Sequence, residues 1–415
     1  QKKEYQQKNG INNITHLATA SLYDSSIKKV CRNPNIRMSH AFSNTLGIDI
    51  EQVDQMKTGT CWLQAALTKL SFMSRIQYVN NEKKTYLRFS VWYLMFFDKI
   101  EKSAVFLTRC LQKRNEDDRE LYHLLQEPIA DGGDWPMFCH LINKYGIVPF
   151  DTYPLSYQAK NSSQLNTVIN QYLRRVCRNV NESNIRSHID KIHDILLRCL
   201  SIPPHSLNLN EEENGLSFEG SPLEFWQLIK KYTRIDDYIC LQDAPTKNLH
   251  AFYTSWYSNN CANLKQHTFF TVQMSELKDA CARCIENKIP VWFTSGTRGG
   301  ADFSRKLLKD RALDYETLFS IDIDDGMTKS DLMRCRYTKP THAMLLIGFH
   351  RNTKGQIVRW KVQNSWKKSG ILSMCDDWFS KNVFEIAIPS NIYHLPPPTK
   401  VTVLEPWDIL STVAN

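Results

Sequence analysis

The hydrophobic pattern of this 415-residue chain changes once, near residue 235, and that change limits the folds available to it. Before it, apolar residues recur every three or four positions, as in the run after Cys61 and in 90–112, which predicts helices with one buried face. After it, short aromatic and β-branched runs bounded by turn residues predict strands, with one helical pattern over 275–288. The pattern therefore predicts an α+β fold whose helical part precedes its β-rich part.

The chain is long enough for several packed subdomains. We expect an N-terminal region and helical subdomain, a mainly helical insertion, a β-rich subdomain and a C-terminal arm, over 1–150, 151–235, 236–400 and 401–415 respectively. The arm is stiffened by prolines and ends in an apolar segment that contains a tryptophan. We therefore expect it to dock on the rest of the protein.

The composition indicates where the protein is expected to reside and whether it is expected to bind a cofactor. No apolar run approaches the roughly 18 residues of a membrane helix, so no membrane association is expected. Twelve scattered cysteines and the absence of a visible secretory signal favour reduced thiols and a cytoplasmic location. Cys281 and Cys284 lack a second ligand pair, so neither a metal nor any other cofactor is expected.

The formal net charge is +9, and basic residues gather in 172–199 and 304–311. A solvated helix face is the simpler explanation of these clusters. The alternative is weak, non-specific binding of nucleic acid through counterion release.

Cys61 lies in the segment EQVDQMKTGTCWLQAAL. Taken alone, such a cysteine is more often an inert core residue. However, Thr58 and Gly59 predict a turn that places Cys61 at a helix N-terminus, where the macrodipole and free N–H groups favour a thiolate. Gln55, six residues earlier, offers a side-chain amide as a donor to an oxyanion.

A histidine and an asparagine in the strand-rich part complete a possible catalytic set. His342 opens one predicted strand, and Asn364 ends the next, 22 residues later. A hairpin would bring them side by side, so that the Asn364 carbonyl fixes the imidazole tautomer and leaves the other ring nitrogen for the thiol. Trp366 could shield that hydrogen bond from water.

With these residues in place, DQMKTGTCW resembles the active-site segment of papain-like cysteine peptidases. Further runs resemble the bleomycin hydrolase and aminopeptidase C branch of that superfamily over roughly residues 30 to 400. These runs are SVWYLMFFDKIEK, DGGDWPM, INKYGIVPFDTYP, SPLEFW, PVWF, THAM, NSW and MCDDWF. The resemblance implies a papain-like fold of two subdomains.

The resemblance also implies roles for individual residues. Cys61 matches the nucleophile, His342 the base, Asn364 the residue that orients the base, and Gln55 the oxyanion donor. The residues implied on the substrate side are Trp366, Gly132, Gly133, Asp134 and the terminal residue Asn415. In the family the C-terminal carboxylate lies in the cleft and holds the free α-amino group of the substrate, which implies that Asn415 limits cleavage to N-terminal residues.

The implied function is a cytosolic cysteine aminopeptidase that acts on peptides with a free N-terminus and assembles as a homohexamer. Three positions depart from the family pattern: Thr60 replaces an arginine, Asp134 a glutamine and Lys367 a glycine. Two alternatives therefore stay open. One is a weakened paralogue that serves as a nucleic-acid-binding or scaffold oligomer; the other is a Cys-His-Asn hydrolase of non-peptide amides or thiolactones.

Overall fold

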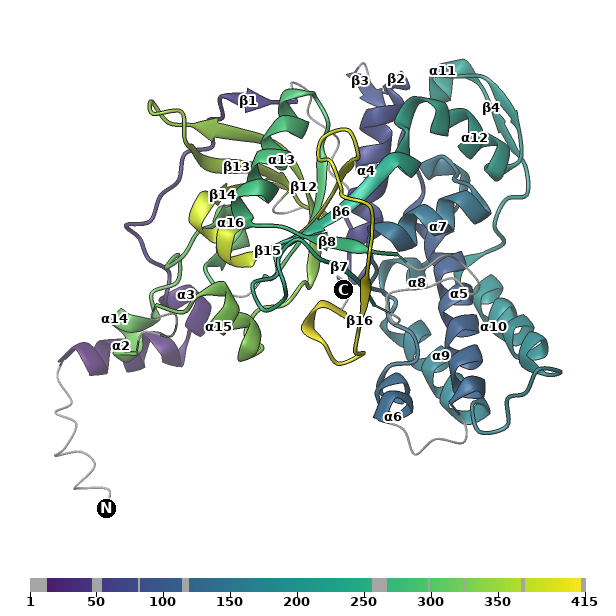
Figure 1. The fold of residues 1–415 in the computed structure, drawn as a ribbon, viewed down its shortest axis with the longest axis horizontal. Helices are drawn as coiled ribbons and strands as arrows, with labels where there is room; N and C mark the ends of the chain where they lie inside the picture. The colour runs from purple at the N-terminus through teal and green to yellow at the C-terminus, as the bar shows by residue number, and fades with distance from the viewer. Residues whose placement is uncertain are drawn as a thin grey trace.

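The computed structural model places a helical half beside a half built on one large sheet (Figure 1). It describes residues 13–46, 54–80, 83–113, 119–255, 267–297, 299–321, 323, 326–366 and 370–411. Helix α4 (Cys61–Ser74) lies where the halves meet, packed against α7 (Trp135–Tyr145) on one side and β12 (His342–Arg351) on the other. All but one of its residues are buried, because it has protein on every side.

The helical half follows from capping signals and apolar periodicity. Ser90 and Asp134 cap α5 and α7 through their side chains, and Ser221 forms a capping box with Glu224 at the start of α12. Gly146 ends α7 at φ +76°, and a Cβ there would lie 2.1 Å from the Pro222 carbonyl oxygen. The helices of this half besides α4 and α7 are α5 (Val91–Gln112), α6 (Arg119–Gln126), α8 (Tyr157–Lys160), α9 (Ser163–Val176), α10 (Ile185–Leu200), α11 (Glu211–Asn214) and α12 (Pro222–Thr233). Two hairpins, β2 (Gln77–Asn80) with β3 (Lys83–Tyr86) and β4 (Leu207–Leu209) with β5 (Phe218–Gly220), complete it.

The sheet runs in the order β10, β11, β14, β13, β12, β9, β15, β6, β8, β7, β16, with β1 paired to β12 off this path. Its strands are β6 (Tyr238–Gln242), β7 (Phe252–Ser255), β8 (Phe269–Thr271), β9 (Val291–Ser295), β10 (Ala301–Asp302), β11 (Leu307–Leu308), β13 (Ile357–Gln363), β14 (Ile371–Cys375), β15 (Val383–Pro389) and β16 (Val401–Leu404). The central strands are almost wholly buried, because α4 covers one face of β12 and α13 (Met274–Glu286) packs against the sheet in a second core. Cys281 and Cys284 are buried in that second core.

The α+β, papain-like fold predicted from the sequence is confirmed. The predicted hairpin is also present: β12 and β13 pair antiparallel in the register that carries Leu345 opposite Gln363. β14 was not predicted, although it closes one side of that hairpin.

Residues 13–46 lie along the sheet half (Figure 1), although the sequence analysis groups them with the helical subdomain. They contain α2 (Asn13–Tyr23), α3 (Ile27–Val30) and β1 (Asn44–Thr45), and β1 pairs antiparallel with β12. The C-terminal residues also join the sheet, because β16 pairs in parallel with β7. Both ends of the described chain are thus attached to the β-rich half.

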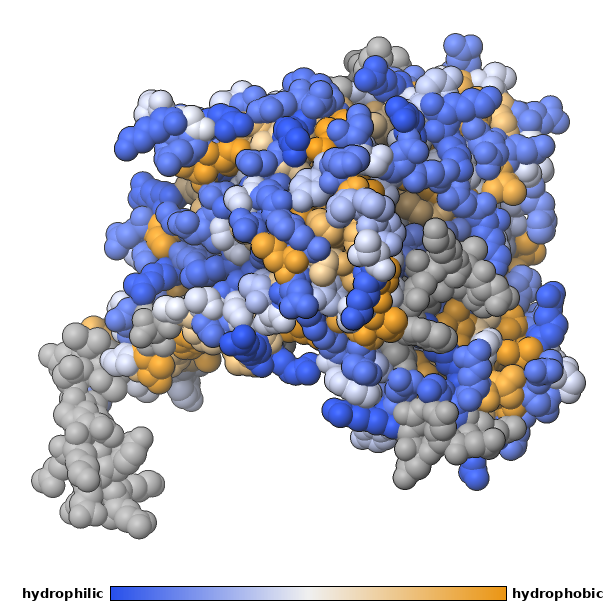
Figure 2. Space-filling model, in the orientation of Figure 1, coloured by the Kyte–Doolittle hydropathy of each residue, from blue (hydrophilic) through white to orange (hydrophobic). Residues whose placement is uncertain are grey.

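The visible face of the molecule is mostly hydrophilic, and its apolar side chains form small separate groups (Figure 2). Within the described ranges, no helix combines the length and the apolar character that crossing a bilayer requires.

Candidate active site

A compact turn precedes Cys61. The Thr58 hydroxyl donates to the Gln55 carbonyl at 2.6 Å and lies 2.7 Å from the Thr60 hydroxyl, and the Gln55 side-chain amide donates to the Thr58 carbonyl at 2.7 Å. Met56 takes a left-handed φ of +57°. This winding starts α4 at Cys61, so the predicted nucleophile is the first helical residue and lies among the free N–H groups of the helix N-terminus.

His342 and Asn364 meet beside that helix end. The imidazole Nε2 lies 2.7 Å from the Asn364 Oδ1, and the backbone N–H of Ala343 donates to the Cys61 Sγ at 3.4 Å. Trp366 stacks on the imidazole, with ring centroids 4.7 Å apart and planes at 28°. Because Oδ1 can only accept, Nε2 carries the proton and Nδ1 is the basic nitrogen.

Gln55 and Ser365 join the two halves at the site. The Gln55 N–H donates to the Ser365 carbonyl at 2.8 Å, and the Ser365 hydroxyl donates to the Gln55 Oε1 at 2.5 Å. The amide carbonyl is thereby held by the sheet half, while its NH₂ group points toward the Cys61 turn. The structure therefore brings together five residues predicted from sequence: Gln55, Cys61, His342, Asn364 and Trp366.

Burial keeps both members of the predicted dyad uncharged in the resting site. It raises the pKa of the Cys61 thiol to about 12. Hydrogen bonds from backbone N–H groups lower this pKa, but their effect is smaller than that of burial. Burial also lowers the pKa of His342 to about 4, and the Asn364 hydrogen bond only partly opposes that effect. The thiol and the neutral imidazole are therefore the resting forms of these two groups.

Asp131 holds the nucleophile turn, and the sequence analysis did not single it out. Its carboxylate accepts from the Gly59 N–H at 2.9 Å, from Asn166 Nδ2 at 2.9 Å, and from Lys99 and Ser162. Despite its burial, Lys99 and these donors hold the pKa of Asp131 well below its usual range. No local pattern marks this role, because all four partners are distant in the chain.

The glycine segment after Asp131 packs against the start of α4. A Cβ at Gly133 would lie 2.4 Å from the Trp62 indole, so this position requires glycine. The Gly132 carbonyl accepts from Lys102 at 2.6 Å, and the Asp134 carboxylate caps α7 through the Met137 N–H at 2.9 Å.

Two positions from the sequence analysis, Asn415 and Lys367, lie outside the described residues. The described arm ends at Ser411, which lines a cavity of about 940 Å³ together with Gly132 and Thr341. This cavity therefore adjoins both His342 and the segment that the sequence analysis assigns to the substrate. Across the described ranges, no group of three or more His, Cys, Asp or Glu side chains is placed to hold a metal ion.

A thiol at a helix N-terminus, faced by a histidine on a strand that an asparagine orients, defines the papain-like class of cysteine peptidases. The sequence matches the Peptidase C1-like family over residues 1–411, and the chain belongs to this family. The predicted resemblance and the predicted class, a cysteine-type peptidase, are thus confirmed.

Named relatives extend over nearly the whole chain. Aminopeptidase C of Lactococcus lactis subsp. lactis is 29% identical over 411 residues, which cover 91% of either chain. Bleomycin hydrolase of Homo sapiens is 27% identical over 419 residues, covering 91% of this chain and 90% of that protein. The crystal structure of PepW from Lactobacillus rhamnosis HN001 has a TM-score of 0.87 at 25% identity and covers 99% of this chain and 98% of its own.

The Asn364 contact leads to a first prediction. Asn364→Ala should lower kcat about 10- to 100-fold, since the hydrogen bond to the imidazolium is worth about 1.5–3 kcal/mol. The pH profile of kcat should shift as well, because the imidazole loses the partner that raises its pKa. Steady-state kinetics across pH would measure both effects. Asn287→Ala, at the exposed end of α13, is the control, and equal kinetics for the two variants would contradict the orienting role.

Proposed function

We propose that this protein is an aminopeptidase that removes N-terminal residues from peptides and related amides through a thioester intermediate. The observation that carries the proposal is the placement of Cys61 at the start of α4, against the strand that begins with His342, with Asn364 bonded to the imidazole. The relatives named aminopeptidase C and bleomycin hydrolase support the same activity.

The chemistry follows from the groups present. His342 takes the thiol proton, and Sγ of Cys61 attacks the first peptide carbonyl, which becomes an oxyanion. The Cys61 N–H and Gln55 donate to that oxyanion; an amide has two N–H donors, of which the Thr58 carbonyl takes one. The imidazolium then protonates the leaving amine, and water hydrolyses the thioester. Because Cys61 is 0% exposed, the entering substrate must displace the groups that cover it.

A panel of fluorogenic aminoacyl amides tests this activity. We expect hydrolysis of amides with a free α-amino group and little hydrolysis of their N-acetylated counterparts. Turnover of thiolactones without any turnover of aminoacyl amides would favour the non-peptide hydrolase instead. Folded protein without turnover of either class would favour the weakened paralogue.

The restriction to N-terminal residues is assigned to Asn415. Three contacts support an ordered path for the arm toward the site: the pairing of β16 with β7, the Lys247–Asp408 ion pair and the packing of Arg119 over the Trp407 ring at 4.1 Å. A carboxylate at the end of this path would attract a cationic N-terminus.

Removing residues 412–415 should therefore lower the preference for free over N-acetylated substrates by about tenfold, the worth of one charge-assisted contact. Cleavage within longer blocked peptides should appear at the same time. Asn415→Ala keeps the terminal carboxylate and serves as the matched control. An unchanged preference in the truncated protein would remove the arm from the substrate site.

Assembly and location complete the proposal. We infer a homohexamer and a cytoplasmic location from the family resemblance. The described cysteines form no disulfides with one another, which supports the cytoplasmic location.

Weak nucleic-acid binding is assigned to the exposed basic side chains of α9 and α10. However, Arg174 already donates to the Leu125 and Gln126 carbonyls, and Arg186 pairs with Asp190. Light scattering would test the homohexamer, and salt-dependent binding of a DNA oligonucleotide would test the nucleic-acid binding.

A further inference from the structure

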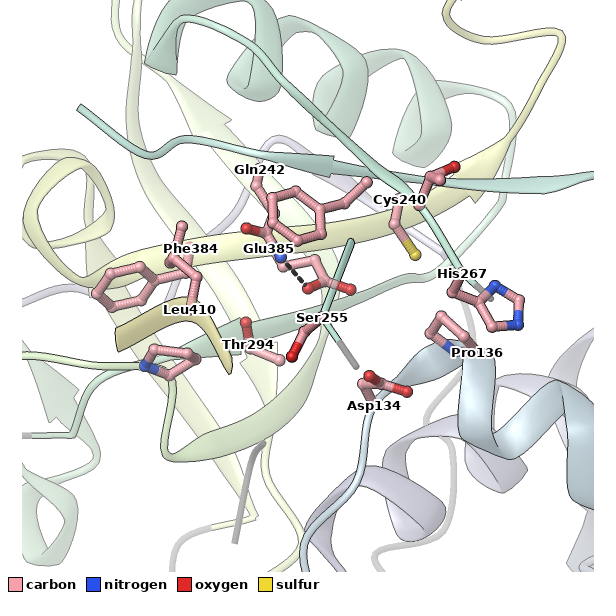
Figure 3. Close-up of a pocket in the computed structure, with 13 residues that line it drawn as sticks. Asp134, Pro136, Cys240, Gln242, Ser255, His267, Thr294, Phe384, Glu385 and Leu410 are labelled. Carbon is pink, nitrogen blue, oxygen red and sulfur yellow. Dashed lines mark hydrogen bonds between the residues drawn. The ribbon is translucent and has the colours of Figure 1, made fainter. Parts of the chain in front are cut away.

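A small cavity lies between the two halves, and its polar lining has no role in the steps above (Figure 3). Its volume is about 30 Å³, room for one or two groups of the size of a water molecule. Two carboxyl groups line it from opposite halves: Asp134 at the start of α7, and Glu385 on β15.

Two buried polar atoms of the lining have no hydrogen-bond partner among the described residues. Gln242 donates its Nε2 to Glu385 at 2.5 Å, and its Oε1 finds no partner among the described residues. The Thr294 hydroxyl is likewise without a partner within the described part of the chain. Gln242 and Thr294 are only 5% and 3% exposed, so bulk water does not satisfy these atoms. Buried polar atoms of this kind can hydrogen-bond a small polar group that enters the cavity.

The basic groups near the two carboxyl groups have other hydrogen-bond partners, and the Lys102 charge only partly opposes the rise in the pKa of Asp134. Lys102 is bonded to Asp98 and to the Ala130 and Gly132 carbonyls, and His267 faces His140 with 2.7 Å between their Nε2 atoms. Burial and the Glu385 charge raise the pKa of Asp134 to about 8, and burial raises the pKa of Glu385 to about 7. The cavity is thus poised to ionise when a cation enters.

The cavity adjoins the nucleophile. Thr294 is the cross-strand partner of Ala343, whose N–H contacts Cys61 Sγ. Pro340, another lining residue, lies two positions before His342, and Leu410 of the arm also lines the cavity. A group held here would lie beside Thr294, one strand away from the Ala343 N–H that contacts Cys61.

We propose that this cavity binds a primary ammonium group of the substrate, and that Asp134 and Glu385 select cationic substrates. The inference rests on the proposed function and adds a specificity to it. An ammonium has three N–H groups, which can donate to the carboxylates, Gln242 Oε1 and Thr294 Oγ1. It also fits the volume of the cavity, whereas the larger planar guanidinium does not. The ammonium can come from a lysine side chain or from the substrate N-terminus.

Two variants, each tested on two pairs of substrates, distinguish a lysine side chain from the substrate N-terminus as the bound ammonium. Asp134→Asn keeps an oxygen that can cap α7, and Glu385→Gln keeps the side-chain shape. If a lysine side chain enters, the wild type should prefer lysyl amide over norleucyl amide, which has the same four-carbon chain without the ammonium, and over arginyl amide. Each variant should then reduce the lysyl-to-norleucyl ratio of kcat/KM about tenfold, as expected for a lost charge-assisted contact. If the α-amino group enters, the ratio of free to N-acetylated norleucyl amide should fall instead.

The selectivity should also depend on pH. Both carboxyl groups ionise as pH rises through about 7 to 8, and a lysine ammonium keeps its charge there, so the preference for lysyl over norleucyl amide should strengthen over that range. An α-amino group loses its own charge over the same range, so no strengthening is expected if it is the group that binds. The cavity also holds Cys240, whose thiol hydrogen-bonds Glu385, and His267. Loss of a proton from either group would act in the same direction, so the trend belongs to the two carboxyl groups only if it weakens in Asp134→Asn and in Glu385→Gln.

A binding measurement keeps this inference separate from the proposed activity. n-Butylammonium should raise the Tm of the wild type more than that of Asp134→Asn, and n-butanol should raise neither. If no amide is hydrolysed but this Tm difference appears, the activity is refuted and the ammonium site stands. Unchanged substrate ratios in both variants, together with equal Tm shifts, would overturn the site.

Discussion

Cys61→Ser should abolish aminoacyl amide hydrolysis, with kcat falling about 10⁴-fold or more, as for removal of nucleophiles in comparable catalytic sets. The serine hydroxyl has nearly the same shape, so the Ala343 N–H keeps an acceptor. It is a far weaker acid than the thiol, however, and the buried imidazole, with its lowered pKa, is a poor base for it. Single-turnover and steady-state rates would measure the loss.

Cys281→Ser is the matched control. Cys281 is as fully buried as Cys61 but lies in the second core, away from the site. Its variant should keep wild-type kcat per folded molecule, even if its Tm falls. Comparable residual activity in the Cys61 variant would show that another group is the nucleophile.

Asp131→Ala should lower the free energy of unfolding by about 3–5 kcal/mol, the usual cost of leaving one member of a buried ion pair alone. Lys99 is fully buried and would be left without its carboxylate partner. The same change removes the acceptor for the Gly59 N–H, so the turn before Cys61 should loosen and kcat should fall too. Urea denaturation at pH 7 would give the free energy.

The pH dependence of stability tests the same group. The pKa of Asp131 lies below its unfolded value, so its contribution is present above about pH 4 and is lost as pH falls further. The variant should therefore lack this part of the acid destabilisation. Asp190→Ala is the control, since its pair with Arg186 is exposed and worth well under about 1 kcal/mol. An equal, small effect of both substitutions would contradict an anchoring role for Asp131.

Much of the site was predictable because its main parts are encoded locally. The turn residues Thr58 and Gly59 mark the start of α4 at Cys61. The β12–β13 hairpin follows from two strand patterns and a short turn, and it alone brings Asn364 to His342. Local dihedral preferences and strand alternation act within a few residues, so a single sequence displays them.

Contacts between distant segments were not predictable. Asp131 joins Gly59, Lys99, Ser162 and Asn166, and Ser365 meets Gln55 across 310 positions. None of these pairs has a period or spacing that marks it. The same is true of β14 and of the crossing of residues 13–46 to the sheet half, because strand pairing depends on which edges the folded chain leaves open.

The chain alone specifies the α+β class, the cysteine at a helix start and the histidine and asparagine on neighbouring strands, because each is written in a local pattern. Only the folded molecule places Asp131 under the nucleophile turn and Asp134 opposite Glu385 in one cavity. The charge state of these acids depends on burial and on partners from other segments, and both arise only when the two halves pack together.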